Sequence, residues 1–524
     1  MLRYVDDDLQ HQAEDLVANG QRLFWGRLWE MGVGKTRPTL QEAAILYREG
    51  KIDALVIVAP KAVALNWIHD QIPQHLPRDI NARCHAYEMP KAKQAGHHAA
   101  CAALVEQRRR RGGLVVLSIS YEGIMSEEGC DLAAKLMADA LPDGGFRSTG
   151  RAMLVADESS YLGNVDAQRT KRMFSLGGLA KYRRILEGTP VTNNPRNVYS
   201  QMKFLDEGYW SWAGRQILGY PLGSFTEFVS TFCIVKKGGN TGRMGRTVGK
   251  GASKKFIPAA QVVGYQRLDD LHKMLMLGAS RLTTEQAGIW LPEKTYQRLK
   301  FELHPKQRKP YDELKREYMT DVQGHLVTAT LAMVRLLRLQ QITSGYLPTF
   351  DERGEAIMVP LVTAAENPRL ELAVEHLNLV PHQTIVFARF TPEVDMLMDA
   401  LGKQAVRYDG QTSDRDRERS LAAFHGGDAK LLVGKVGAAG RGLTLTEAKR
   451  TVYYSNDFDY GMRKQSEKRA HRIGQKDPCF YDDLQARRTV DGQIIESHLS
   501  KDEIAAQVTG DRLMEWLTDN SEAA

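Results

Sequence analysis

The sequence contains few cysteines, and their spacing fits neither a metal module nor a disulfide framework. Five cysteines are scattered along 524 residues, and no CxxC pair occurs. No apolar run is long enough to cross a bilayer. The first residues, MLRYVDDDLQ, are acidic where a signal peptide would be basic and then apolar. We therefore expect a cytoplasmic protein with no membrane partner and no zinc module.

The composition indicates a globular protein of more than one domain. Hydrophobic residues make up 43% of the chain and charged residues 26%, which is enough apolar material for a full core. The length predicts about three units. A net charge of +7 weakly favours a polyanionic partner.

Short apolar runs alternate with helical patterns in two parts of the chain. Runs such as ALVIVAP (54–60) and QTIVFAR (383–389) predict buried strands of parallel sheets, and hence α/β units. Between them, residues 311–341 have a helical rhythm with a break at Gly324. The expected organisation is an α/β unit over 1–206, a helical insertion over 207–345, a second α/β unit over 346–500 and a helical tail over 501–524.

A glycine-rich turn at residues 29–36, WEMGVGKT, has the composition of a phosphate-binding loop. Such a turn leading into a helix presents main-chain N–H groups and the positive end of the helix dipole to phosphate oxygens. The strict pattern has glycine where Trp29 stands, so a glycine turn with a surface lysine is the alternative. The residues expected to hold ATP here are Met31, Gly32, Val33, Gly34, Lys35 and Thr36.

Two adjacent carboxylates follow an apolar run in MLVADESSYLGN (153–164). A pair at the end of a strand is either a polar turn or the metal-and-water site of a nucleotide hydrolase. Given the upstream loop, we expect Asp157 and Thr36 to hold Mg²⁺, and Glu158 to orient and deprotonate the attacking water. Lys35 would contact the β- and γ-phosphates.

These motifs resemble those of superfamily-two helicases of the Swi/Snf type, over about residues 8 to 500. EMGVGKT, DESSYLGN and LEGTPVTNN resemble motifs I to III, and VFARFTPEVDML, GAAGRGLTLTEA and QSEKRAHRIGQ resemble motifs IV to VI. The last string is the most specific. VGYQRLDDLHKML and LPEKTYQRL resemble compact prokaryotic or bacteriophage members and the HARP-like annealing helicases.

The resemblance implies two RecA-like lobes with helical Swi/Snf-type insertions, and ATP hydrolysis in the cleft between them. It implies that Arg469 and Arg472 stabilise the charge on the transferred phosphoryl group, with Arg472 as the principal arginine finger. It also places Gly442 at the nucleotide and Gln12 at the adenine, with a surface glutamine as the alternative for Gln12. A monomer without a chromatin-reader domain is expected, in a bacterial or phage-infected cytoplasm.

The chain departs from the resembled family in the element that links ATP to nucleic acid. Ser159 and Ser160 replace the usual Ala-His, and Glu187 replaces a threonine in motif III. We expect Ser160 to make a rewired contact with motif III. The coupling residues are predicted to be Ser160, Glu187, Thr189 and Gln465.

The resemblance implies contacts with duplex or branched DNA on both lobes. Trp67 has an alternative interpretation as a core residue. The basic loop at 236–255 fits a solvated loop as well as it fits a loop that contacts phosphate. The predicted DNA-contacting residues are Lys61, Asn66, Trp67, Ser120, Tyr121, Thr192, Asn193, Lys236, Lys237, Arg243, Arg246, Arg389 and Arg441.

The function predicted from these residues is ATP-driven movement along DNA in replication, recombination or repair. Strand separation or annealing is a second enzymatic interpretation. A nucleotide-gated DNA-binding protein with weak hydrolysis and an RNA-directed helicase remain as alternatives from other classes.

Overall fold

A computed structural model describes residues 9–192, 194–236, 245–248, 255–258, 261–324, 329–350, 356–439 and 443–509. The chain forms two compact units. The described residues of 9–232, 267–290 and 503–509 belong to the first unit, and those of 233–266 and 291–502 to the second.

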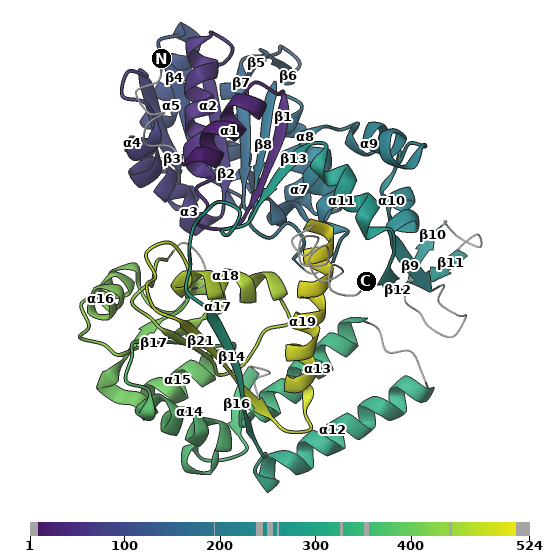
Figure 1. The fold of residues 1–524 in the computed structure, drawn as a ribbon, viewed down its shortest axis with the longest axis vertical. Helices are drawn as coiled ribbons and strands as arrows, with labels where there is room; N and C mark the ends of the chain where they lie inside the picture. The colour runs from purple at the N-terminus through teal and green to yellow at the C-terminus, as the bar shows by residue number, and fades with distance from the viewer. Residues whose placement is uncertain are drawn as a thin grey trace, which may run out of the picture. The chain divides into compact units, whose positions relative to one another are not determined.

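The first unit is built on a seven-stranded sheet in which every pairing is parallel (Figure 1). In spatial order the strands are β13 (Ala279–Leu282), β1 (Phe24–Trp29), β8 (Tyr182–Leu186), β7 (Ala152–Asp157), β2 (Ala54–Ala59), β4 (Leu114–Ser120) and β3 (Ala82–Tyr87). A small antiparallel pair joins β5 (Ala138–Ala140) and β6 (Phe146–Ser148). The helical segments are α1 (Gln10–Asn19), α2 (Thr36–Arg48), α3 (Lys61–Asn66), η2 (Trp67–Gln71), α4 (Ile72–His75), η3 (Met89–Lys91), α5 (Ala95–Arg110), η4 (Gly123–Met125), α6 (Glu127–Met137), η5 (Ser159–Leu162), α7 (Gln168–Gly177), α8 (Asn197–Leu205), α9 (Tyr209–Leu218), α10 (Phe225–Phe232) and α11 (Leu268–Met276).

The second unit has a six-stranded sheet whose pairings are also all parallel. Its strands run in the order β14 (Lys294–Phe301), β21 (Cys479–Ala486), β20 (Arg450–Tyr453), β17 (Thr384–Ala388), β19 (Leu431–Lys435) and β18 (Ala405–Tyr408). Three antiparallel pairs join β9 (Cys233–Lys236) to β12 (Gln261–Tyr265), β10 (Gly245–Val248) to β11 (Lys255–Pro258), and β15 (Tyr346–Phe350) to β16 (Ala356–Pro360). The helical segments are α12 (Pro305–Gly324), α13 (Ala329–Thr343), η7 (Ala364–Glu366), α14 (Pro368–Leu379), α15 (Thr391–Leu401), η8 (Gly402–Gln404), α16 (Asp414–His425), α17 (Val436–Ala439) and α18 (Tyr460–Ala470). Helix α19 (Val490–Thr509) belongs to this unit as far as residue 502.

Strand β17 shows why these strands are continuous apolar runs in the sequence. Val386 and Ala388 belong to one buried core cluster of the second unit, and Ile385 and Phe387 belong to another. Because successive side chains of a strand point to opposite faces, helices must cover both faces of this sheet. The predicted α/β class, with one parallel sheet in each of two units, is confirmed.

The middle region differs from the helical insertion predicted for it. It contains α12 and α13, and α12 ends at the predicted break, Gly324, but it also supplies an edge strand to each sheet. These strands, ASRL in β13 and KTYQRLKF in β14, are only partly buried, so they carry polar residues and lack a long apolar run. The boundaries at residues 206, 345 and 500 remain predictions. Among the described helices, none is long and apolar enough to span a bilayer.

Candidate functional site

The phosphate loop connects the end of β1 to the start of α2. Gly32 and Gly34 have φ values of +89° and +85°, in the left-handed region that favours glycine. A side chain on Gly34 would also collide with the amide of Gln12. The two glycines therefore let the loop turn tightly into α2, whose first N–H groups are suited to an anion.

Gln12 and its neighbour hold this loop from α1. Gln12 Nε2 donates a 3.0 Å hydrogen bond to the Gly34 carbonyl, and His11 Nε2 lies 3.0 Å from the Val33 carbonyl. Gln12 is buried, with 4% of its surface exposed. The residue predicted to read adenine thus also supports the loop, and adenine recognition stays a prediction.

Lys35 is a half-buried cation beside several carboxylates. Its Nζ donates to the main-chain carbonyls of Trp29 (2.8 Å) and Glu30 (3.1 Å). Burial lowers the pKa of Lys35, while the charges of Glu158, Glu187 and Asp157 act to raise it. The lysine therefore supplies the positive charge that this acidic edge of the sheet requires.

Asp157 lies at the carboxyl end of β7, held by two hydrogen bonds. Its Oδ2 accepts a 2.9 Å hydrogen bond from Trp67 Nε1, and its Oδ1 accepts a 3.0 Å hydrogen bond from the Glu158 amide. Burial and the neighbouring charge of Glu158 raise the pKa of Asp157 from 3.8 to about 6, despite the Trp67 bond and Lys35. Crowded carboxylate oxygens of this kind fit a hard divalent cation, which would relieve their repulsion.

Glu158 has a strained backbone, with φ +52° in the left-handed region. A non-glycine residue there costs about 1–3 kcal/mol, and such strain is often found at functional sites. The strain is consistent with a side chain that is aimed by the turn after β7.

Ser160 of motif II is bonded to Glu187 of motif III through its main-chain amide and also through its hydroxyl. The coupling role of this contact stays a prediction. The Ser160 amide donates a 2.6 Å hydrogen bond to Glu187 Oε2, while Glu187 Oε1 accepts from the amides of Gly188 (2.9 Å) and Thr189 (2.8 Å). Glu187 is 1% exposed. Burial and the charge of Glu158 raise its pKa from 4.5 to about 7, against these hydrogen bonds.

Two predicted DNA contacts are corrected by the structure. Trp67 and Tyr121 are 1% and 0% exposed, so neither can stack on a base or reach a phosphate. The Tyr121 hydroxyl donates to the main-chain oxygen of Asp157 (2.9 Å), and its ring stacks on Tyr161 at 4.8 Å. Both side chains position the Asp157 turn instead. Ser120 is buried as well, and its hydroxyl accepts from the Gly123 amide.

The other predicted DNA residues of the first unit have accessible surface. Lys61 is exposed at the start of α3, and Asn66 and Thr192 are half-buried. Lys236 and Arg246 belong instead to the second unit, on β9 and β10, where the structure describes the backbone alone. Five predicted residues lie outside the described part of the chain: Asn193, Lys237, Arg243, Arg441 and Gly442.

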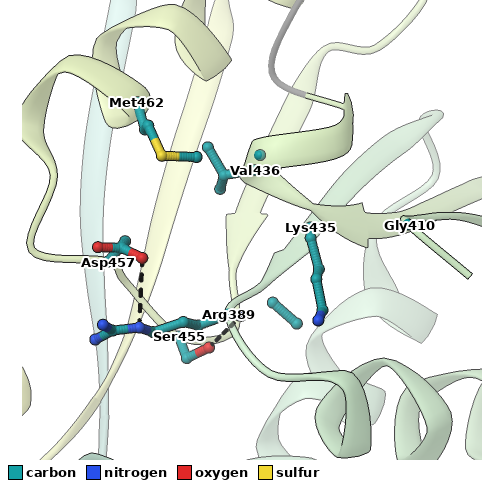
Figure 2. Close-up of a pocket in the computed structure, with 9 residues that line it drawn as sticks. Arg389, Gly410, Lys435, Val436, Ser455, Asp457 and Met462 are labelled. Atoms are coloured by element: carbon teal, nitrogen blue, oxygen red, sulfur yellow. Dashed lines mark hydrogen bonds and ion pairs between the residues drawn. The ribbon is translucent and has the colours of Figure 1, made fainter. Parts of the chain in front are cut away.

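A pocket of about 440 Å³ lies at the carboxyl ends of β17 and β19 in the second unit (Figure 2). Arg389 Nε lies 3.3 Å from Asp457 Oδ2, and the Arg389 amide donates to Ser455 Oγ at 2.8 Å. Lys435, whose Nζ donates to Thr391 Oγ1, also lines the pocket. Ligands of parallel α/β sheets bind at this end of the strands. Arg389 is a predicted DNA contact, whereas Lys435 was not predicted, although its position directly after LLVG marks it as a strand-end residue.

The two arginines of motif VI are anchored to the same segment of the second unit. Arg469 is 4% exposed, and its guanidinium donates to the carbonyls of Gln465 (3.1 Å) and Leu443 (3.2 Å). Arg472 is half-buried and donates to Thr444 Oγ1 at 2.8 Å. Burial lowers the pKa of Arg472. Arg472 is the more accessible of the two, and its catalytic role stays a prediction.

Two family models match the chain. A model described as the SNF2-related domain matches residues 29–344, and a helicase conserved C-terminal domain matches residues 369–474. The first contains the phosphate loop and the Asp157–Glu158 pair, and the second contains the pocket around Arg389.

The chain is similar to parts of longer curated proteins. The human "DNA annealing helicase and endonuclease ZRANB3" is 25% identical over 496 residues, which is 92% of this chain and 38% of that protein. The Saccharomyces cerevisiae "DNA repair and recombination protein RDH54" is 24% identical over 377 residues, or 69% of this chain and 38% of that protein. The chain thus spans less than half the length of these relatives.

A solved structure, "Sulfolobus solfataricus SWI2/SNF2 ATPase core in complex with dsDNA", aligns over 96% of this chain and 94% of that chain at 19% identity, with a TM-score of 0.38. The family assignment rests on the two family models and not on this likeness. Because the SNF2-related domain model covers more than half of the 524 residues, the chain belongs to the SNF2-related family.

Proposed function

We propose that this chain is an ATP-driven DNA translocase that hydrolyses ATP and moves along duplex or forked DNA in replication, recombination or repair. One observation carries the proposal. The carboxyl edge of one parallel sheet holds the phosphate loop with Lys35, the Asp157–Glu158 pair and Glu187. These charged side chains are close enough to shift one another's pKa. This edge combines a phosphate cradle with a place for a metal and a base for water.

ATP would occupy the loop formed around Gly32 and Gly34, where α2 presents its N-terminal amides. Lys35 would exchange the two carbonyl oxygens that it now contacts for phosphate oxygens, which carry more negative charge. Thr36 and Asp157 would hold Mg²⁺, whose charge offsets that of the phosphates. Glu158 would orient the attacking water and accept its proton.

The second unit would complete the reaction. Arg472, supported by Arg469, would stabilise the charge that develops on the transferred phosphoryl group. Gly442 would lie against the nucleotide, and Gln465 and Thr189 would belong, with Ser160 and Glu187, to the coupling path. Closure of two RecA-like lobes, over about 1–206 and 346–500, would then be required for turnover.

DNA contacts would be mainly to phosphate, and hence sensitive to salt and nearly blind to sequence. The structure supports Arg389 and adds Lys435, because both line a basic pocket at a strand end. The remaining proposed DNA-contacting residues are Lys61, Asn66, Ser120, Thr192, Asn193, Lys236, Lys237, Arg243, Arg246 and Arg441.

The finer proposals concern the type of motor. We place the chain among compact members near the annealing helicases, acting as a monomer, with a prokaryotic or phage source. ZRANB3 is described as an annealing helicase, so strand annealing is the second candidate activity. Displacement and annealing assays on tailed and blunt duplexes would separate it from simple tracking.

The assigned base is tested by Glu158→Gln. The variant should bind ATP with unchanged affinity and lose turnover by a factor of about 10² or more. Glu106→Gln, on the far part of α5 and paired with Arg110, is the matched control and should keep full turnover. Equal turnover in Glu158→Gln and the wild type would refute the assignment.

A further inference from the structure

Three side chains that can bind a transition metal meet in the first unit, away from the phosphate loop. His85 lies on β3, and His97 and Cys101 lie on α5, which packs against that edge strand (Figure 1). A spacing of four residues puts His97 and Cys101 on the same face of the helix. One ligand atom from each of the three residues lies within 4.8 Å of the other two.

The two histidine rings face each other at close range. His85 Nε2 lies 3.1 Å from His97 Nδ1, and the ring centroids are 4.8 Å apart. Two imidazole nitrogens that share a tetrahedral Zn²⁺ at Zn–N distances of about 2.0–2.1 Å lie roughly 3.3 Å apart. The pair therefore needs little movement to share an ion.

His97 is not satisfied as a core histidine. The residue is 8% exposed, and its Nε2 has no hydrogen-bond partner within the described part of the chain. Nδ1, the ring nitrogen that faces His85, is the one that an ion shared with His85 would take, so Nε2 would carry the proton of the neutral ring. His97 and Cys101 also line a pocket of about 560 Å³, which gives a ligand access to them.

The protonation states suit a metal. Burial lowers the pKa of both histidines, and for His85 the neighbouring His97 lowers it further, so both rings are neutral near pH 7 and offer lone pairs. Burial raises the pKa of Cys101, so its thiol stays protonated until a cation compensates the thiolate charge.

We propose that His85, His97 and Cys101 form a binding site for a borderline-soft divalent cation, with Zn²⁺ as the preferred ion and one coordination position open to solvent. Two nitrogens and a sulfur are donors that Zn²⁺ prefers, whereas Mg²⁺ prefers the oxygen donors at Asp157. On binding, the Cys101 thiol releases its proton to solvent as the sulfur–metal bond forms. The hydrogen bond between the two histidine rings breaks. The proton that formed it moves to the other nitrogen of the ring that donated it.

The test uses Co²⁺ as a spectroscopic probe of the full chain after treatment with a chelator. The expected result is one equivalent of Co²⁺ with the visible bands of tetrahedral coordination and a thiolate-to-metal charge-transfer band, both removed by Zn²⁺. Cys101→Ser should abolish the charge-transfer band. His97→Gln and His85→Gln should each weaken the Zn²⁺ competition roughly tenfold or more.

Controls make the result specific. Cys130→Ser changes another half-buried helical thiol, outside the cluster, and should leave every band unchanged. Co²⁺ at the phosphate loop would give no thiolate band, because neither that loop nor Asp157–Glu158 contains cysteine. Far-UV circular dichroism of each metal-free variant establishes that it is folded. The proposal would be overturned if the wild-type protein showed no charge-transfer band. It would also be overturned if the charge-transfer band survived in folded Cys101→Ser.

Discussion

The main-chain amide of Ser160 donates a 2.6 Å hydrogen bond to the buried carboxylate of Glu187. This bond links the turn after β7 to the turn after β8, although neither residue is the one usual in the resembled family. Any residue at position 160 would offer this amide, so the bond depends on the carboxylate of Glu187. We infer that the link between the two motifs has been rebuilt and not lost.

Replacing Glu187 by alanine removes the acceptor of three main-chain N–H groups, those of Ser160, Gly188 and Thr189. The expected loss in the free energy of unfolding is roughly 2–4 kcal/mol, measured by urea denaturation. Ser160→Ala is the matched control. It keeps the amide and should cost less than about 1 kcal/mol.

The same two variants test coupling. DNA stimulation of ATP hydrolysis should fall in Glu187→Ala and persist in Ser160→Ala. Loss of stimulation in Ser160→Ala would show that the hydroxyl, and not the amide, carries the link.

Trp67→Phe tests whether this indole positions Asp157 or touches DNA. The substitution removes the 2.9 Å hydrogen bond that holds the pKa of Asp157 down. The acid limb of the ATPase pH profile should therefore move to higher pH, with unchanged affinity of the ATP-free protein for duplex DNA in a binding titration. Weakened DNA affinity with an unmoved pH profile would restore the DNA-contact interpretation.

The carboxylate cluster predicts how ATP hydrolysis depends on pH. Asp157 must be ionised to hold Mg²⁺, and its pKa is raised to about 6, so the rate at low ATP should fall as the pH drops through about 6. A rate that stays level down to about pH 4 would contradict the raised pKa.

Stability should change with pH in the opposite sense. In the folded protein the pKa of Asp157 is about 6 and that of Glu187 about 7, against ordinary values of 3.8 and 4.5. Between the ordinary and the raised values, the folded protein therefore binds more protons than the unfolded chain. The melting temperature of the ligand-free protein should therefore be higher near pH 5 and fall as the pH rises through about 7. Glu187→Ala should show a smaller fall, because one of the two groups is gone.

The pocket of the second unit predicts two separate phosphate contacts. Arg389→Ala and Lys435→Ala should each weaken DNA binding regardless of sequence and reduce the slope of log affinity against log salt by about 1. Arg419→Ala, an exposed cation on α16 paired with Asp416, should change neither quantity appreciably. If Arg389→Ala and Lys435→Ala keep the salt slope of the wild-type protein, as Arg419→Ala should, the pocket does not contact DNA.

Local sequence was sufficient to predict the phosphate loop and the Asp157–Glu158 turn. Each depends on a few consecutive residues, and the structure shows the helix after the loop and the strand before the turn. The left-handed conformation of Gly32 and Gly34 was not predicted. The same reasoning left Trp67 open between a DNA contact and a core residue, because its partner Asp157 is 90 positions away and the contact depends on the order of strands in the sheet.

Features that depend on packing between distant segments could not be predicted. The spacing of His97 and Cys101 is visible in the sequence, but His85 joins them only because α5 lies against the edge strand β3. Likewise, β13 and β14 are short or polar edge strands whose pairing partners decide their structure.

We propose that ATP hydrolysis at this site drives movement on DNA. The most direct test is steady-state ATP hydrolysis without nucleic acid and with duplex DNA, single-stranded DNA, forked DNA or RNA, at two salt concentrations. We expect strong stimulation by duplex or forked DNA that weakens at the higher salt concentration. No stimulation, or stimulation by RNA alone, would contradict the account.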